Sequence, residues 1–160
     1  MAALKTVDDL RAAVVRRLES LPVLPGIAVI PEDRQNITTE IQKALGMGRG
    51  MVIIVYTGNA KNTAPAAPIP QCDLEMIIEI AEIPAINRGA TGTKIPGAEV
   101  ARYCVRALHQ YAWTPGRCLT FQEQEYRPEQ ALGSNKKVQV VQYFLTFKTH
   151  VSFDAEIGVI

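Results

Sequence analysis

The sequence predicts an α+β fold, in which an antiparallel or mixed β-sheet carries helices packed on one of its faces. Three observations lead to this prediction. Apolar residues recur at helical spacing in three segments, apolar runs of strand length lie between them, and several of these runs follow one another without an intervening helix. The expected order of elements is α-β-α-β-β-α-β-β, in a single domain that spans residues 1–160.

The first expected helix begins near Thr6 and ends before Pro22. Thr6 is a suitable N-cap residue, and the two aspartates after it lie in the first turn, where the helix dipole favours acidic groups. Apolar residues then recur at helical spacing, at Leu10, Val14, Leu18 and Leu21. A short strand, IAVIP at 27–31, follows this helix.

A second helix is expected over residues 36–45, closed by Gly46 in the C′ position. The segment GMGRG at 46–50 resembles a phosphate-binding loop, but its glycines follow a helix and precede a strand. Phosphate loops need the reverse order, so a turn is the better interpretation. The run MVIIVYT at 51–57 is rich in β-branched residues, as an inner strand would be.

A long loop is expected to project from residues 57–72, between that strand and the alternating strand DLEMIIEIAEIP at 73–84. Its sequence begins TGNAKNTAPAAPIPQ. Connections of this length without secondary structure are usually functional or disordered. The part APAAPIP favours polyproline II, so the loop is expected to reach about 20 Å as a semi-rigid arm.

A second loop, Gly-rich and mobile, is expected at residues 84–97. The segment AEVARYCVRALHQYAW at 98–113 then has one apolar stripe, with Arg102, Arg106 and His109 away from it, and predicts a helix. Two strands complete the order, CLTFQEQEY at 118–126 and KVQVVQYFLTFKTHVSF at 137–153. The residues PEQALGSNK are expected to join them as a hairpin.

The last strand is unusually long. From Val138 to Phe153 it would span about 50 Å at ~3.3 Å per residue. Its apolar residues share one face, broken only by Thr149: Val141, Tyr143, Leu145, Phe147, Val151 and Phe153. A small domain is not expected to cover so long a stripe by itself, so either a bulge bends the strand or a neighbouring subunit covers part of it.

No residue pattern predicts catalysis, a metal site or a cofactor. The three cysteines form no CxxC pair, and neither histidine has a carboxylate, cysteine or second histidine at ligand spacing. The glutamate pairs 75/79 and 123/125 are typical of solvated strand faces. Lys and Arg total 17 against 16 Asp and Glu, which argues against nucleic-acid recognition, and no apolar run approaches a membrane span. We expect a cytoplasmic protein that is not an enzyme.

In element order the sequence resembles the tail terminator proteins (tail-completion or minor tail proteins) of long-tailed bacteriophages and prophages. The resemblance covers nearly the whole chain, chiefly LRAAVVRRLESL, IAVIP, CDLEMIIEIAEIP, AEVARYCVRALHQYAW and the final strand pair. Members of that family form hexameric rings that cap the tail tube, stop its polymerisation and present a surface to the head connector. The helix at 36–45 and the Pro-rich arm depart from the shorter members.

The resemblance implies a structural protein that assembles with itself as a homo-hexamer and with tail-tube and head-connector proteins. It would lie in the cytoplasm of the bacterial host during assembly and in the virion tail afterwards. The expected contact residues are Asn59, Lys61, Asn62, Pro65, Pro68, Arg88, Lys94, Tyr143 and Phe147. The alternative hypothesis is a small α+β ligand- or protein-binding module without catalysis, which predicts a monomer or dimer with a concave apolar site.

Overall fold

The computed structural model confirms the α+β class. It describes residues 7–24, 26–32, 37–47, 49–132 and 135–152. The helices are α1 (Val7–Glu19), α2 (Ile37–Met47), α3 (Pro84–Asn87) and α4 (Gly97–Leu108). The strands are β1 (Ala28–Pro31), β2 (Met51–Asn62), β3 (Gln71–Glu82), β4 (Ala112–Thr114), β5 (Arg117–Cys118), β6 (Thr120–Leu132) and β7 (Asn135–Ser152).

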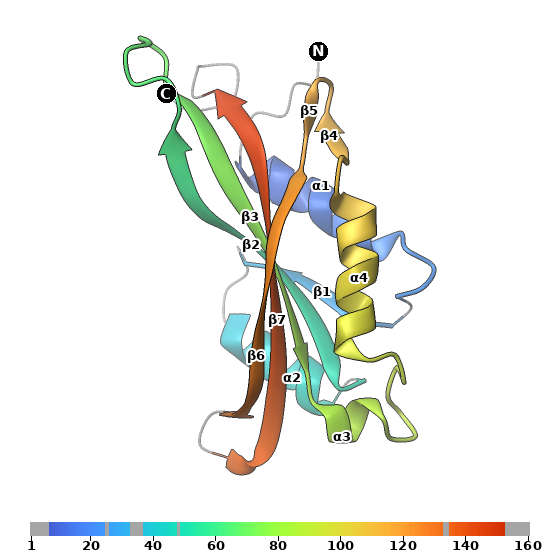
Figure 1. The fold of residues 1–160 in the computed structure, drawn as a ribbon. Coiled ribbons are helices and arrows are strands. Elements are labelled where there is room, and N and C mark those ends of the chain that lie inside the picture. Colours follow the sequence, from blue (N-terminus) through green and yellow to red (C-terminus); the bar gives the residue numbers. More distant parts are fainter. Residues whose placement is uncertain (1–6, 25, 33–36, 48, 133–134, 153–160) are drawn as a thin grey trace.

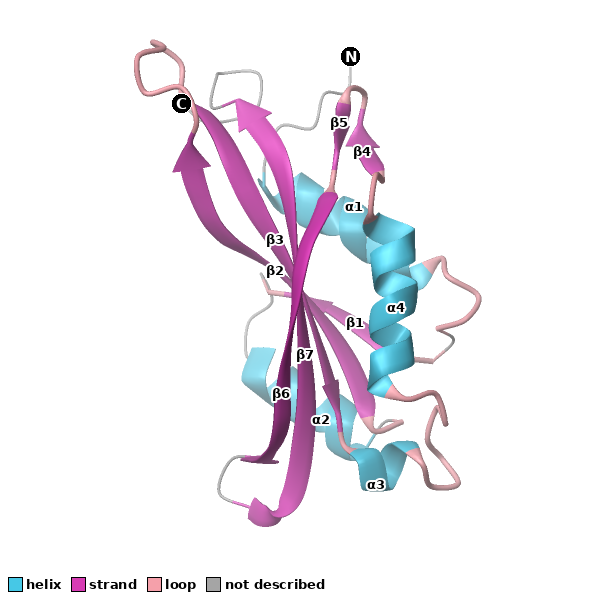
Figure 2. Ribbon diagram, viewed as in Figure 1, coloured by secondary structure: helices cyan, strands magenta, loops and turns pink. Residues whose placement is uncertain are grey.

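Five of the strands form one mixed sheet, in the order β1-β2-β3-β7-β6, while β4 and β5 form a small separate sheet (Figure 2). Only β1 and β2 run parallel; the other neighbours in the large sheet are antiparallel. The β3–β7 ladder is continuous, from Gln71 opposite Ser152 to Glu82 opposite Val141. Register shifts interrupt both of the ladders that flank it.

The main core lies between the sheet and two helices, α1 and α4, which cover the same face (Figure 1). As the alternation in β3 predicts, every second residue of that strand enters this core: Leu74, Met76, Ile78 and Ile80. The apolar stripe of α4 meets them through Val100, Cys104 and Leu108. Burial of these stripes is the main force that holds the two layers together.

The third long helix, α2, lies on the opposite face, so the expectation that all helices share one face is wrong in this detail. Leu45 of α2 belongs to a second buried cluster with Ile30, Val52 and Ile54. The helix also runs through Gly46, which the sequence had suggested as its C′ residue. The turn that follows depends on Gly50, whose φ of +76° and contact with the backbone of Asn87 leave no room for a side chain.

The projecting loop is shorter than expected, because both strands continue into it. β2 extends to Asn62 and β3 begins at Gln71, so residues 63–70 alone form the tip. The Thr63 amide donates to the Gln71 carbonyl at 2.7 Å, and the Ala67 amide donates to the Ala64 carbonyl. The tip is therefore a compact turn on a two-stranded ribbon, and the straight polyproline arm that we expected is not formed.

Most of the apolar stripe of β7 is covered within the chain, contrary to expectation: Val141, Leu145, Phe147 and Val151 are buried, and Tyr143 is half-buried. Phe147 is completely buried and meets the ring of Phe121 edge-on, with 5.5 Å between centroids. Towards the end of the strand, the unpredicted β4–β5 hairpin supplies Trp113, whose indole donates to the Thr149 hydroxyl at 2.7 Å. Thr149 thus continues the buried face as a satisfied polar residue. Phe153, Gly133 and Ser134 lie outside the described residues.

The complete burial of Phe147 leads to the first prediction. Phe147→Ala should lower the free energy of unfolding by about 3–5 kcal/mol, since it removes buried area and leaves a cavity under α4. Chemical denaturation of the purified chain measures this loss. Thr146→Ala, on the opposite and half-buried side of β7, should cost about 1 kcal/mol or less. Equal losses in the two variants would contradict the assignment of Phe147 to the core.

Candidate assembly surfaces

Five of the sequence-predicted contact residues lie together on the projecting β2–β3 hairpin. Asn59, Lys61 and Asn62 are exposed on the extended part of β2, and Pro65 and Pro68 are exposed at its tip. Sequence reasoning missed Ile69, which is 44% exposed beside these prolines. Because β1 pairs with β2 only as far as Val55, the hairpin extends beyond the edge strand and is accessible along its outer side (Figure 1).

Arg88 and Lys94 are also exposed, but they lie at the opposite end of β3 from the hairpin tip. Their loop is organised around Asn87, which is 1% exposed. The Asn87 amide donates to the Glu82 carboxylate and to the Ile95 carbonyl, and its oxygen accepts from the Thr93 amide and hydroxyl. The loop that the sequence suggested to be mobile is thus held by a hydrogen-bonded network.

The buried Glu82 carboxylate connects this loop to helix α4. Its Oε1 accepts from the Gly97 amide at 3.3 Å, at the first residue of the helix, where no local side chain caps the chain. A carboxylate in this position satisfies a free amide and is favoured by the helix dipole. Gly92 is required inside the same network, since a β-carbon there would lie 2.0 Å from the Asn87 carbonyl oxygen.

Of the two aromatic contact residues predicted on β7, only Tyr143 reaches a surface. Its ring lies 5.1 Å from that of Tyr126, which is 53% exposed. The two tyrosines and Arg88 border an open hollow of about 460 Å³. Phe147 points into the core instead, so its prediction as a contact residue is wrong.

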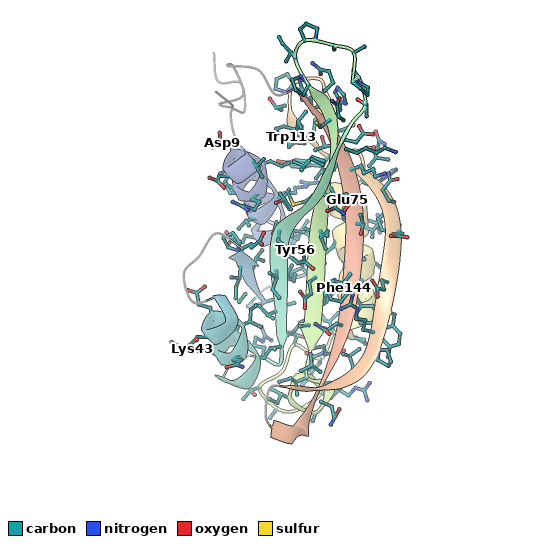
Figure 3. All side chains as sticks on the ribbon, turned by 90° about the vertical axis from the view of Figure 1, so that its left-hand side faces the viewer. Asp9, Lys43, Tyr56, Glu75, Trp113 and Phe144 are labelled. Atoms are coloured by element: carbon teal, nitrogen blue, oxygen red, sulfur yellow. The ribbon has the colours of Figure 1, made fainter. Side chains whose placement is uncertain are left out.

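A larger surface is formed by the side of β3, β7 and β6 that faces away from α1 and α4; we call it the open sheet face. Cross-strand neighbours share it, since directly opposed residues point to the same side of a sheet. The face extends onto β2, and its charged and aromatic members are Tyr56, Lys61, Asp73, Glu75, Glu79, Glu123, Glu125, Arg127, Phe144, Lys148 and His150. Figure 3 shows Tyr56, Glu75 and Phe144 on this side, with α2 confined to one border.

The centre of the open sheet face is half-buried and polar at once. Burial raises the pKa of the Glu79 carboxyl above its ordinary value, against the opposing effects of the Gln142 amide, which donates to it at 2.6 Å, and of Arg127. Burial and the nearby Glu79 raise the pKa of Tyr56 to about 12. The Arg127 guanidinium lies 4.3 Å from the Phe144 ring centroid and binds Glu125. Aromatic residues and arginine, such as Phe144 and Arg127 here, are enriched where proteins meet partners.

The two histidines make hydrogen-bond or ion-pair contacts within the chain, and two of the three cysteines are buried. The Phe121 amide donates to Nδ1 of His109 at 3.1 Å, just after α4 ends. His150 does have a carboxylate neighbour, since its Nδ1 lies 3.4 Å from Asp73 on the adjacent strand; this pair was invisible in the sequence. Cys72 and Cys104 are buried, and burial raises the pKa of the Cys104 thiol to about 12. The thiol form of Cys104 is therefore strongly favoured.

Metal-binding clusters and membrane-spanning helices are both absent from the described part of the chain. These residues contain no group of three or more His, Cys, Asp or Glu side chains arranged to hold a metal ion. None of the helices in the same part is long and apolar enough to cross a membrane.

Comparison with known proteins relates the fold to a virion component. No protein-family model and no curated protein sequence matches the chain. Its fold is similar to that of a chain in a solved structure of the virion of a native gene transfer agent particle, with a TM-score of 0.57 and 19% sequence identity. The similarity covers 89% of this chain and 94% of the other. At this identity the match establishes a shared fold.

The Asn87 network generates a stability prediction. Asn87→Ala should lower the free energy of unfolding by at least about 2 kcal/mol, because it leaves the buried Glu82 carboxylate and the Thr93 hydroxyl with fewer partners. Urea denaturation followed by circular dichroism provides the measurement. The neighbouring, exposed Arg88→Ala should stay within about 0.5 kcal/mol of the wild type. A neutral Asn87 variant would show that the network does not stabilise the fold.

A pH dependence follows from Glu79. Its folded-state pKa is raised, so folding favours the protonated carboxyl; this contribution is present below the unfolded-state pKa and is lost as pH rises through the folded-state pKa. Glu79→Gln keeps an acceptor for the Gln142 amide without the charge. We expect the variant to have the higher Tm at pH 7, with the difference shrinking as pH falls towards about 4. The exposed Glu123→Gln is the control, and a pH-independent difference would contradict this account.

Proposed function

We propose that the chain is a structural protein of a phage-like particle and that it acts by assembly, without catalysis. The observation that carries this proposal is the fold similarity to a chain of a gene transfer agent virion, which extends over nearly the full length of both chains. Function does not follow from fold alone. The surfaces of this chain add support, because they offer a projecting hairpin and a broad open sheet face, as an assembling subunit requires.

The finer part of the proposal is the role in the particle. The chain forms a ring, a hexamer by the resemblance to tail terminator proteins, that caps the tail tube, ends tail polymerisation and joins tail to head. Its partners are further copies of itself, the tail-tube protein and the head-connector proteins. It assembles in the host cytoplasm and ends in the virion tail. The projecting hairpin is the element that we assign to contact with the tube or the adjacent subunit.

Two measurements test this role. Negative-stain images and light scattering of the purified chain should show a closed ring of several copies, alone or when tail tubes are added. Loss of the gene should give tails of uncontrolled length without heads. Tails of normal length would contradict the terminator role while leaving a place elsewhere in the particle. A strict monomer that binds no tail or head protein would contradict the whole proposal.

The hairpin tip gives a prediction specific to this function. Replacing residues 64–70 by Asn-Gly joins Thr63 to Gln71 through a two-residue turn and removes Pro65, Pro68 and Ile69. The free energy of unfolding should change by less than about 1 kcal/mol, since the tip is exposed and the ladder below it is kept. Binding to tail tubes, measured by co-sedimentation, should be lost.

A matched control is Pro115→Ala, which changes an exposed proline in the turn between β4 and β5 and should leave co-sedimentation unchanged. If the shortened hairpin binds tubes as well as the wild type, the tip is not a contact element. If it unfolds instead, the tip belongs to the folded core.

A further inference from the structure

We propose that neighbouring copies of this chain contact each other head to tail, with the helix-covered side of one copy docked on the open sheet face of the next. The occupant of the open sheet face is thus a second copy of the same chain. The inference rests on the proposed function only for closure of these contacts into a ring. The contact itself follows from the charges of the two surfaces and from their placement on opposite sides of the chain.

The first surface is an arginine ridge on the outer side of the helices. It consists of Arg17 of α1, Arg102 and Arg106 of α4, and the half-buried tyrosines Tyr103 and Tyr111. Arg17 connects the two helices: its Nε donates to the Ala107 carbonyl at 3.2 Å, and its guanidinium lies 5.2 Å from the Tyr111 ring centroid. Arg102 lies similarly over Tyr103.

These contacts hold two of the three arginines against aromatic rings before any partner arrives. Less side-chain freedom then has to be given up on docking. Glu99 pairs with Arg102 and offsets one positive charge, so the ridge is positive overall. Arginine and tyrosine are the residues most often found at the energetic centres of protein interfaces.

The second surface, the open sheet face, has the opposite sign. It carries five carboxylates, Asp73, Glu75, Glu79, Glu123 and Glu125, against three permanent cations, Lys61, Arg127 and Lys148. Arg127 already pairs with Glu125, so four carboxylates remain against the two lysines and the face is negative overall. The chain as a whole has a formal charge of only +1, so the two signs are separated onto different sides of one nearly neutral molecule. Such complementarity orients partners and suppresses wrong pairings.

The placement of the two surfaces sets the mode of association. α1 and α4 cover one side of the sheet and the open sheet face is the other side, so a single copy cannot bring its own two surfaces together (Figures 1 and 3). A standard interface takes about 800 Å² from each partner. The accessible surface of the chain is 8938 Å², far more than two such contacts would bury. Contacts between two different surfaces propagate, and they close into rings or run on as filaments.

Paired charge reversals test this contact in the full-length chain. The ridge variant carries Arg102→Glu and Arg106→Glu, and the face variant carries Glu123→Lys and Glu125→Lys; all four side chains are exposed. Each variant places like charges at its own contact, so we expect self-association, measured by sedimentation velocity at about 0.05 M salt, to weaken at least tenfold. The equimolar mixture should recover it, because every contact between unlike copies then joins opposite charges.

A control variant and the salt dependence of self-association complete the test. Lys43→Glu reverses an exposed charge on α2, at the opposite border of the sheet from β6, and should leave self-association unchanged. Wild-type self-association should weaken at 1 M salt, where the screening length falls to about 3 Å. Thermal melts of each variant establish that the fold is kept.

The inference is overturned if the wild-type chain stays monomeric up to about millimolar concentration. It is also overturned if only one of the two charge-reversed variants loses self-association, or if the equimolar mixture of the two variants does not regain it. The proposed function fails differently, when the chain neither enters particles nor binds tail or head proteins. A ring in assembled particles that is insensitive to both reversals would overturn the head-to-tail contact and leave the proposed function intact.

Discussion

The uninterrupted pairing of β3 with β7 is the constraint on which the rest of the structure depends. Twelve residues of β3 face β7 without a register shift. Side chains alternate strictly between the two faces of a sheet, so a slip of one residue would move Met76, Ile78 and Ile80 from the core to the open side. Burial of that one face therefore specifies the register, and the register specifies which residues remain for contact with partners.

The same ladder separates the functional elements at its two ends. Gln71 leads into the projecting hairpin, and Glu82 leads into the hydrogen-bonded loop that starts α4. At ~3.4 Å per residue these ends are about 37 Å apart. Irregularities are confined to the flanking ladders, where β2 shifts beyond Thr57 and β6 shifts at three places. A rigid centre with adaptable borders suits a subunit that must repeat the same contact in every copy.

The proposed assembly surfaces are distributions of charge and shape over large areas of the chain. The polar side chains that are buried, Glu82, Asn87 and Thr149, bind one another, backbone groups or Trp113. Surface complementarity of this kind can be kept with very different residues. The chain shares its fold with a chain of a virion at 19% identity, so that fold is compatible with very different sequences.

Local patterns in the sequence were sufficient to predict the fold class and the longer elements, but not α3 or the β4–β5 hairpin. Period-two alternation in β3 and the helical stripes of α1 and α4 report burial of a single face, and the β-branched run of β2 reports an inner strand. Nearby residues encode all of these patterns. Five of the predicted contact residues lie together on one hairpin, because they are close to one another in the chain. The side of the sheet chosen by α2 could not be predicted, because β2 is buried on both faces at that point.

Everything that joins distant residues was decided by the tertiary structure. The Asp73–His150 pair, the Trp113–Thr149 hydrogen bond and the cover over Phe147 bring together segments far apart in the chain. The open sheet face likewise combines residues of β3, β6 and β7 that have no common local pattern. A stripe such as that of β7 specifies that one face must be buried, and only packing of the whole chain specifies what buries it.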